Sequence, residues 1–199
     1  MRIRGRRILI PLLLLAAMVQ TAAARAQSAP QGKVLTIEDY NRWRSISDEE
    51  ISEDGRWVGW TYGLNRADDT LHVALVDGDR HHMVPRGSDV AFSDDGRWAA
   101  YFVSLPREEQ QALREKREPV HRKAQLMDLE SGETTTWERA ASFAFAEGSR
   151  AFIVRKMRAD REAEHQGADL ILRWLDEGTE ELIGSVEEAS FNKPGTRLA

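Results

Sequence analysis

Cysteine is absent from the 199 residues, so neither disulfide bonds nor thiolate metal sites can hold this protein together. No apolar run reaches the roughly 20 residues that a membrane-spanning helix needs. The sequence also lacks a glycine-rich phosphate loop and the G-x-S-x-G nucleophile elbow of α/β-hydrolases. We therefore predict no catalytic residue, no cofactor or cofactor-binding residue and no metal ligand in this chain, and a stability that comes from packed apolar surface.

Residues 1–26 have the pattern of a secretory signal peptide. Four arginines stand among the first seven residues, ahead of an apolar stretch at 8–19, and Ala24-Arg25-Ala26 matches the small-x-small cleavage pattern. An uncleaved interfacial anchor is the alternative interpretation. We predict an exported protein, periplasmic or secreted, with no stable membrane span after signal cleavage.

Basic residues are too few for a nucleic-acid-binding face. The chain has 28 basic and 33 acidic residues, a formal net charge of −5. Residues 1–26 hold five arginines and no acid, which leaves 23 basic and 33 acidic residues and a charge of −10 in the predicted mature chain. Nucleic-acid binding favours the opposite balance, so we predict no nucleic-acid partner.

A short pattern recurs four times along the chain and is the most informative feature of the sequence. Its glycines, at Gly55, Gly96, Gly148 and Gly195, are 41, 52 and 47 residues apart. Such periods in a strand-rich unit are typical of β-propeller blades. The four segments are I-S-E-D-G-R-W-V-G-W (51–60), A-F-S-D-D-G-R-W-A-A-Y-F-V (91–103), A-F-A-E-G-S-R-A-F-I-V (144–154) and S-F-N-K-P-G-T-R-L-A (190–199).

Each segment reads as a strand, a tight turn and a second strand. Aspartate can accept bonds from nearby backbone amides, and glycine can take the positive φ that a tight turn demands. The residues after the turns, at 57–60, 98–103 and 151–154, are apolar at consecutive positions. A strand with one solvent-exposed face would alternate apolar and polar residues, so we predict that these strands are buried on both faces between stacked blades.

A second unit follows each of these segments, at 71–79, 124–133 and 168–180. It reads as a strand, an acid-plus-glycine turn and a short return strand at 82–84, 134–137 and 181–183. Two hairpins per repeat make a four-stranded blade. We predict an all-β protein with about three blades of a larger, incomplete propeller at 46–199, after a lead-in segment at 27–45. An ordinary antiparallel sandwich is the alternative.

An open propeller would expose strand edges and blade faces, so we expect the sequence to be truncated before any catalytic domain. Self-association into a closed ring is the alternative. Two insertions interrupt the strands. In the first, at 104–123, Ser104 is predicted to cap a helix that has Pro106 in its first turn and ends before Pro119. The second insertion, at 156–167, is polar. A short helix is predicted from Thr36, bearing Tyr40 and Trp43.

Histidines and acids offer weak site candidates. His81 and His82 stand near Asp77 and Asp79, but adjacent strand residues point to opposite faces, so the two histidines are poorly placed to share a metal ion. The remaining histidines are interpreted as scattered and the tryptophans as packing residues. The acid pairs Asp68-Asp69 and Asp94-Asp95 lack the twelve-residue calcium loop. The pairs Gly87-Ser88, Gly148-Ser149 and Gly184-Ser185 are assigned to turns.

Taken together, four stretches resemble the propeller of exported bacterial prolyl oligopeptidase family serine peptidases. They are Y-N-R-W-R-S-I-S (40–47), I-S-E-D-G-R-W-V-G-W (51–60), V-A-F-S-D-D-G-R-W-A-A-Y (90–101) and Q-L-M-D-L-E-S-G-E (125–133). The charged helical insertion is similar too. The third and fourth turns, Glu147-Gly148-Ser149 and Lys193-Pro194-Gly195, depart from the Asp-Gly pattern.

The resemblance implies that a C-terminal α/β-hydrolase domain with a Ser-Asp-His triad follows the propeller. It implies oligopeptide hydrolysis by the complete protein, with the propeller limiting entry to short peptides and inactive by itself. The missing hydrolase domain and a peptide substrate are then the expected partners. TolB-like periplasmic propellers share the Asp-Gly-Arg-Trp motif, so a non-enzymatic protein-binding module is the alternative.

Overall fold

The computed structural model describes residues 35–40, 42–64, 67–158 and 167–199, and the predicted signal peptide lies outside them. Residues Tyr40–Ala199 form one compact unit, separate from the residues that precede it. Strands dominate this unit, which confirms the predicted all-β class. None of the helices in the described residues is long and apolar enough to cross a membrane.

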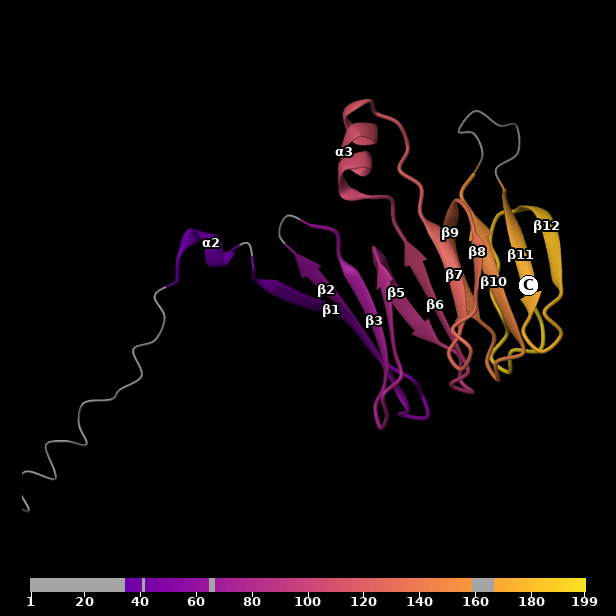
Figure 1. Cartoon of the computed structure of the whole chain (residues 1–199). Coiled ribbons are helices and arrows are strands. Elements are labelled where there is room, and N and C mark those ends of the chain that lie inside the picture. The colour runs from indigo at the N-terminus through magenta and orange to yellow at the C-terminus, as the bar shows by residue number, and fades with distance from the viewer. Residues whose placement is uncertain (1–34, 41, 65–66, 159–166) are drawn as a thin grey trace, which may run out of the picture. The chain divides into compact units, whose positions relative to one another are not determined.

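Three four-stranded antiparallel sheets follow one another along the chain, and each has its strands in sequence order (Figure 1). We call them blades 1, 2 and 3. Two hairpins build each blade, as the repeat predicts, and the order of the strands confirms propeller blades. Blade 1 contains β1 (Arg44–Ile51), β2 (Trp57–Leu64), β3 (Thr70–Leu75) and β4 (His81–Pro85); blade 2 contains β5 (Gly87–Phe92), β6 (Trp98–Val103), β7 (Lys123–Asp128) and β8 (Thr134–Trp137); blade 3 contains β9 (Ala140–Phe145), β10 (Ala151–Lys156), β11 (Ala168–Trp174) and β12 (Glu180–Val186).

The two predicted helices are present, but the N-cap of the longer one and the extent of the shorter one differ from the prediction. Helix α3 (Arg107–Glu115) occupies the first insertion and contains no buried residue. Its N-cap is Pro106, without a side-chain cap bond, so the assignment of the cap to Ser104 is wrong. Ser104 instead donates its backbone N–H to the carbonyl oxygen of Arg86, at 3.0 Å. Helix α2 (Ile37–Tyr40) is a single turn, so it carries Tyr40 but ends before Trp43, which the prediction had placed on it.

Arginines in the left-handed region make the links between blades. Arg86 joins blades 1 and 2 with φ 62°, and Arg139 joins blades 2 and 3 with φ 56°. Their carbonyl oxygens accept the backbone N–H of Ser104 and of Met157. The strain of this conformation in a residue with a Cβ atom is therefore offset by an equivalent bond in both links.

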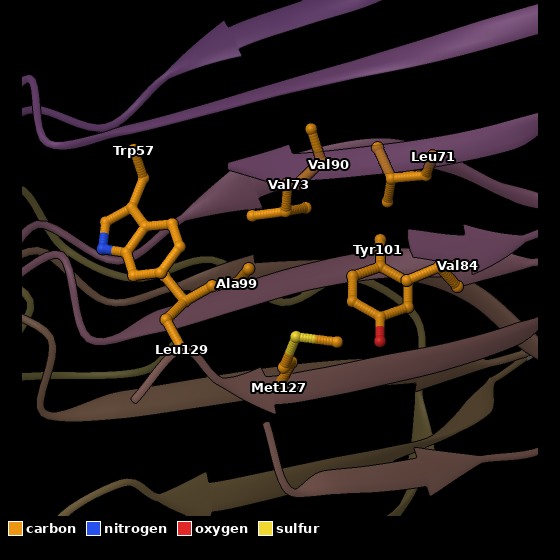
Figure 2. Close-up of a cluster of buried hydrophobic side chains, with 9 residues drawn as sticks. All are labelled: Trp57, Leu71, Val73, Val84, Val90, Ala99, Tyr101, Met127 and Leu129. Carbon is orange, nitrogen blue, oxygen red and sulfur yellow. The ribbon is translucent and has the colours of Figure 1, made fainter. Parts of the chain in front are cut away.

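Apolar side chains fill the space between consecutive blades. Blades 1 and 2 enclose one buried cluster, shown in Figure 2, in which the ring of Tyr101 and the side chain of Met127 lie below Leu71 and Val73. Blades 2 and 3 enclose a second cluster around Leu126, Trp137 and Phe152. A third cluster lies on the far face of blade 3, where Ala189, Phe191 and Leu198 pack against it; Phe191 and Leu198 also form an isolated bridge.

The predicted burial on both faces is confirmed for two of the three apolar strands. Strand β6 is buried at four consecutive positions, 99–102, and β10 at 151–154. In β2 the pattern alternates instead: Trp57, Gly59 and Thr61 are buried, and the residues between them are half-buried. Among the described residues, no blade covers the second face of β2, so one face of this first sheet remains open.

The first two turns of the repeat have the same hydrogen bonds. In the first, the hydroxyl of Ser52 donates to Oδ1 of Asp54 at 2.6 Å and accepts the backbone N–H of Trp57 at 2.9 Å. In the second, Ser93 donates to Asp95 at 2.5 Å and accepts from Trp98 at 2.9 Å. The serine hydroxyl thus joins the turn aspartate to the next strand, which explains the S-x-D-G-R-W pattern.

In the third turn, the residue that corresponds to Gly55 lies one position after the glycine. The bond from Gly55 N–H to the Ser52 carbonyl has its counterpart in Ser149 N–H and the Ala146 carbonyl, at 2.8 and 3.0 Å. Ser149, and not Gly148, is therefore the equivalent of Gly55, and both residues of the third turn have positive φ. The spacing of the glycines therefore places this turn one residue too early, because Ser149 occupies the left-handed position that glycine has in the first two turns.

Successive turns also contact each other across the blade boundaries. The backbone N–H of Gly148 donates to Oδ2 of Asp94 at 2.6 Å, and the N–H of Asp95 donates to the hydroxyl of Ser149 at 3.0 Å. Gly96 lies so close to Asp54 that a Cβ atom on it would be 2.9 Å from the Asp54 Cγ. These contacts join turn to turn along one end of the blades.

Asp54 is expected to titrate about two pH units below an ordinary aspartate. The hydroxyl of Ser52, then the backbone and the guanidinium of Arg56, lower its pKa from 3.8 to about 2. Because the folded pKa lies below the unfolded one, the carboxylate's stabilising effect is complete above about pH 4 and is lost as the pH falls towards 2. Carbon-13 NMR titration should give this pKa, and Ser52→Ala should raise it. An unchanged pKa in that variant would contradict the role given to the hydroxyl.

Candidate functional site: the exposed face of blade 1

The face of a blade that packs on the next blade in the chain is here called its forward face, and the opposite face its rear face. Trp57, Leu71 and Val73 belong to the forward face of blade 1 and pack on blade 2. Side chains alternate along a strand, so the intervening positions form the rear face. The rear face of blade 1 carries Ile46 and Ile51 on β1, Val58, Trp60 and Tyr62 on β2, His72 on β3, and His81 and Met83 on β4.

The position of Trp60 is buried in the other two blades. Trp60 pairs with His72 across β2 and β3, as Tyr101 pairs with Gln125 in blade 2 and Val154 with Ile171 in blade 3. Tyr101 is 1% exposed and Val154 0% exposed, because a preceding blade covers each of them. On blade 1, by contrast, Ile51 is 64% exposed, whereas its counterparts Phe92 and Phe145 pack against the clusters between blades.

Two histidines form a hydrogen-bonded pair on this face. The Nδ1 of His72 and the Nε2 of His81 are 2.9 Å apart. The indole of Trp60 stacks on both imidazoles, with ring centroids 5.2 Å from His72 and 5.9 Å from His81. Tyr62 meets His72 edge-on at 4.8 Å. In this geometry one ring must donate and the other accept, so a single proton lies between the two nitrogens.

The surroundings of His72 disfavour a positive charge on its ring. Burial, the neighbouring His81 and then Arg44 lower the pKa of His72 below its ordinary value of 6.5. The guanidinium of Arg44 lies over the ring of Tyr62, 5.7 Å from its centroid. The rear face is therefore an apolar and aromatic surface with two imidazoles at its centre and a cation at its side.

One polar atom in this face has no partner. The indole Nε1 of Trp60 is buried and makes no hydrogen bond within the described part of the chain. A buried donor without an acceptor costs roughly 1–3 kcal/mol. The face therefore offers stacking, apolar contact and a donor, which are means of binding another surface.

The predicted divergence of His81 and His82 to opposite faces is confirmed, but His72, interpreted as one of the scattered histidines, lies beside His81. His81 contacts the rear-face ring of Trp60, whereas His82 points forward, with its Nε2 3.4 Å from the Leu129 carbonyl oxygen and its ring 6.0 Å from Trp57. His72, from a different strand, is the partner of His81. His121 lies 3.2 Å from the sulfur of Met157, and His165 is outside the described residues.

The other candidates have structural positions. Gly87-Ser88 lies in β5 and Gly184-Ser185 in β12, so the assignment of these two pairs to turns is wrong, while Gly148-Ser149 is a turn. Asp68 accepts the backbone N–H of Arg107 at 2.9 Å, and Asp94 and Asp95 bond to the third turn. No group of three or more potential metal ligands occurs among the residues that the structure describes.

The tryptophans divide between packing and exposed positions. Trp57 and Trp137 are buried in the two clusters between blades, as expected of packing residues. Trp43 is 51% exposed and Trp174 43%, and Trp60 belongs to the rear face. Sequence reasoning missed the rear face because Trp60 and His72 are twelve residues apart and meet only through strand pairing; the signal for it was their place in the repeat.

The stacked four-stranded blades define a β-propeller architecture, and solved propellers of peptidases are similar to it. The β-propeller domain of the Trilobed protease from Pyrococcus furiosus aligns at 14% identity and a TM-score of 0.53, over 75% of this chain and 46% of that one. An acylaminoacyl peptidase solved with Z-Gly-Gly-Phe-chloromethyl ketone aligns at 12% identity and 0.52, over 80% and 28%. A structure from a study of two prolyl endopeptidases aligns at 11% and 0.52, over 98% and 32%.

At these identities the likeness establishes the fold. The chain spans between 28% and 46% of the length of these three structures. No protein-family model matches the sequence. A search of curated proteins found no match either.

Proposed function

We propose that this chain is the N-terminal propeller portion of an exported, prolyl-oligopeptidase-like serine peptidase. Its blades would limit the access of substrates to a C-terminal α/β-hydrolase domain and would be inactive alone. The observation that supports this proposal best is the fold, because the three four-stranded blades align with solved structures of an acylaminoacyl peptidase and a prolyl endopeptidase.

The substrates proposed for the complete protein are oligopeptides, cleaved through covalent serine catalysis. The role of this part would be passive, because its sequence lacks the G-x-S-x-G nucleophile elbow of α/β-hydrolases. Helix α3, solvent-exposed and fixed to the loop before β3 through Arg107 and Asp68, is suited to contact a neighbouring domain.

The complete protein, isolated from its natural source, should react with a fluorophosphonate probe. We expect one labelled species longer than 199 residues whose peptides include this chain, because an activated serine is phosphonylated irreversibly. Mass spectrometry of the labelled peptide identifies the serine. The 199-residue chain, expressed alone, is the control and should not react.

An absence of labelling in a longer, folded protein with further blades would contradict the peptidase proposal. That result would favour the TolB-like alternative, a propeller that binds proteins without catalysis. Reading the gene beyond the Ala199 codon gives an independent answer. Further blades followed by G-x-S-x-G, and an Asp and a His beyond it, are expected for the peptidase.

A further inference from the structure

We propose that three side chains on the rear face of blade 1, those of His72, His81 and Met83, form a copper-binding site. The three residues come from the neighbouring strands β3 and β4. Imidazole nitrogen is a good ligand for copper, and the softer thioether sulfur favours its cuprous form. Strand pairing brings this donor set together, which is why the sequence alone indicates no metal ligand. The site does not depend on the proposed peptidase function.

The two facing histidine nitrogens have a spacing that suits chelation of one ion. The Nδ1 of His72 and the Nε2 of His81 are 2.9 Å apart. With metal–nitrogen bonds of about 2.0–2.1 Å, this spacing corresponds to an angle of about 90° at the ion, as in tetragonal Cu²⁺ or Ni²⁺ sites. A tetrahedral Zn²⁺ ion would need the two nitrogens roughly 3.3 Å apart. Nitrogen ligands bind Cu²⁺ more tightly than Ni²⁺, so the pair fits Cu²⁺ best.

Copper binding requires both facing nitrogens to present a lone pair. A neutral imidazole carries one proton, and either of its two nitrogens can hold it. When His72 holds its proton on Nε2 and His81 on Nδ1, the ion takes the place of the hydrogen bond and no proton leaves the pair. The indole of Trp60 stacks on both rings, with centroids 5.2 and 5.9 Å away. This stacking keeps the two ligands side by side before the ion arrives.

Met83 supplies the third donor of the site. It pairs directly with His72 across β3 and β4, and it follows His81 by two residues, so all three belong to one face. The Cβ atoms of directly paired residues are about 4.5–5.5 Å apart, a distance that the flexible methionine side chain can span. Met83 is 64% exposed, so its side chain has room to turn its sulfur towards the imidazoles.

The site lies on a part of the blade that stays open to solvent where blades stack. Thr134 and Thr136 occupy the positions of His81 and Met83 in blade 2, and both are exposed although blade 1 packs on that face. Leu182, at the position of Met83 in blade 3, is 67% exposed. A longer propeller would therefore leave the outer strand of the site accessible to an ion and to the water that completes its coordination.

One positive charge near the site opposes the binding of a cation. The guanidinium of Arg44 lies 5.7 Å from the ring centroid of Tyr62, which in turn meets His72 edge-on at 4.8 Å. We expect Arg44→Gln to tighten Cu²⁺ binding by a few-fold, because it removes this repulsion. The measurement belongs at about 0.01 M salt, where screening is weak. An affinity that is unchanged or lower would contradict the position given to the ion.

Titration of the purified chain with Cu²⁺, followed by tryptophan fluorescence, tests the imidazole part of the site. We expect saturable quenching by a single bound ion, since Trp60 lies against both ligands. His72→Gln with His81→Thr installs the residues that blade 2 has at these positions. This double variant should weaken Cu²⁺ binding by at least about tenfold, the loss that follows even from removing an outer-shell partner of a metal ligand.

His121→Gln is the matched control for the loss of an imidazole. The Nδ1 of His121 also faces a methionine sulfur, that of Met157 at 3.2 Å, but there a single imidazole is paired with the sulfur. We expect this variant to bind Cu²⁺ as the natural chain does. Far-UV circular dichroism shows whether each variant retains its strands.

Met83→Leu tests the thioether separately from the imidazoles and installs the residue that blade 3 has at this position. Competition with the cuprous chelator bicinchoninate, in the absence of oxygen, measures the affinity for Cu⁺. We expect this variant to bind Cu⁺ about tenfold more weakly and Cu²⁺ with less than about a twofold change, because the soft sulfur prefers the cuprous ion. Unchanged Cu⁺ affinity would remove Met83 from the site.

Three results would overturn the copper site. The first is Cu²⁺ binding of equal strength in the natural chain and in the folded double variant. The second is a loss of binding in His121→Gln, which would assign the ion to His121. The third is Zn²⁺ bound by the natural chain as tightly as Cu²⁺, which would contradict the choice of metal. None of them bears on the proposed peptidase, which is tested by serine labelling of the complete protein.

Discussion

Leu126→Ala should lower the free energy of unfolding by about 2–5 kcal/mol, the largest effect expected of a single substitution here. Leu126 is 0% exposed and belongs to the cluster between blades 2 and 3, next to Trp137 and Phe152. Removing its three outer carbons forfeits their burial and leaves a cavity that two rigid sheets cannot close. Equilibrium urea unfolding, followed by tryptophan fluorescence, measures the loss.

Leu182→Ala is the matched control, because the substitution is the same and Leu182 is 67% exposed on the last strand of blade 3. We expect it to change stability by less than about 0.5 kcal/mol. Similar losses at both positions would contradict the seam between blades 2 and 3 as the place where Leu126 contributes. Both variants leave the rear face of blade 1 unaltered.

Gly96→Ala should destabilise the chain more than Gly55→Ala, although the two glycines occupy equivalent turns. Gly55 has φ 70° and Gly96 φ 64°, so both variants suffer the strain of a left-handed residue with a Cβ atom, about 1–2 kcal/mol. A Cβ atom at Gly55 would meet nothing within 4 Å. At Gly96 it would press on the carboxylate of Asp54 and lie 3.1 Å from the guanidinium of Arg56.

Urea unfolding of the two variants, measured together, isolates the contact between turns as the difference. We expect Gly96→Ala to cost at least about 1 kcal/mol more, since Asp54 must leave its bonds to Ser52 and Arg56 to make room. Equal losses of unfolding free energy in the two variants would show that the contact between the first and second turns does not contribute to stability. Asp54→Ala with Gly96→Ala should remove most of the difference, because the obstructing group is gone.

The blades were predictable from the sequence because residues close together in the chain determine the turns and strands of each repeat. The Asp-Gly turns, the apolar strands after them and the acid-glycine hairpins all indicate the same four-stranded unit, and the structure confirms it. Local signals failed where a different residue serves the same geometry. Ser149 takes the left-handed position of a glycine, and Pro106 begins α3 where Ser104 was expected to.

The candidate site was less predictable, for a reason that concerns pairing. His72 and His81 are adjacent in space because β3 and β4 form a hairpin of fixed register. A shift of that register by one residue would place one histidine on the forward face, and the sequence alone does not fix it. The sequence does predict that His81 and His82 diverge, because alternation along one strand needs no partner strand.

The turn-to-turn bonds and the interblade clusters have a consequence for how the molecule loses its structure. Among the described residues, the bonds that Asp94 and Asp95 make outside their own turn go to the third turn, and the two clusters between blades each join neighbouring blades. Each blade is therefore stabilised by contacts with its neighbours, as in solenoid proteins. The free energy of unfolding is then approximately the sum of the stabilities of the single blades and of the interfaces between adjacent blades. Melting should then begin at a terminal unit and advance inward, and an internal junction weakened by Leu126→Ala would divide the array into two parts that melt separately.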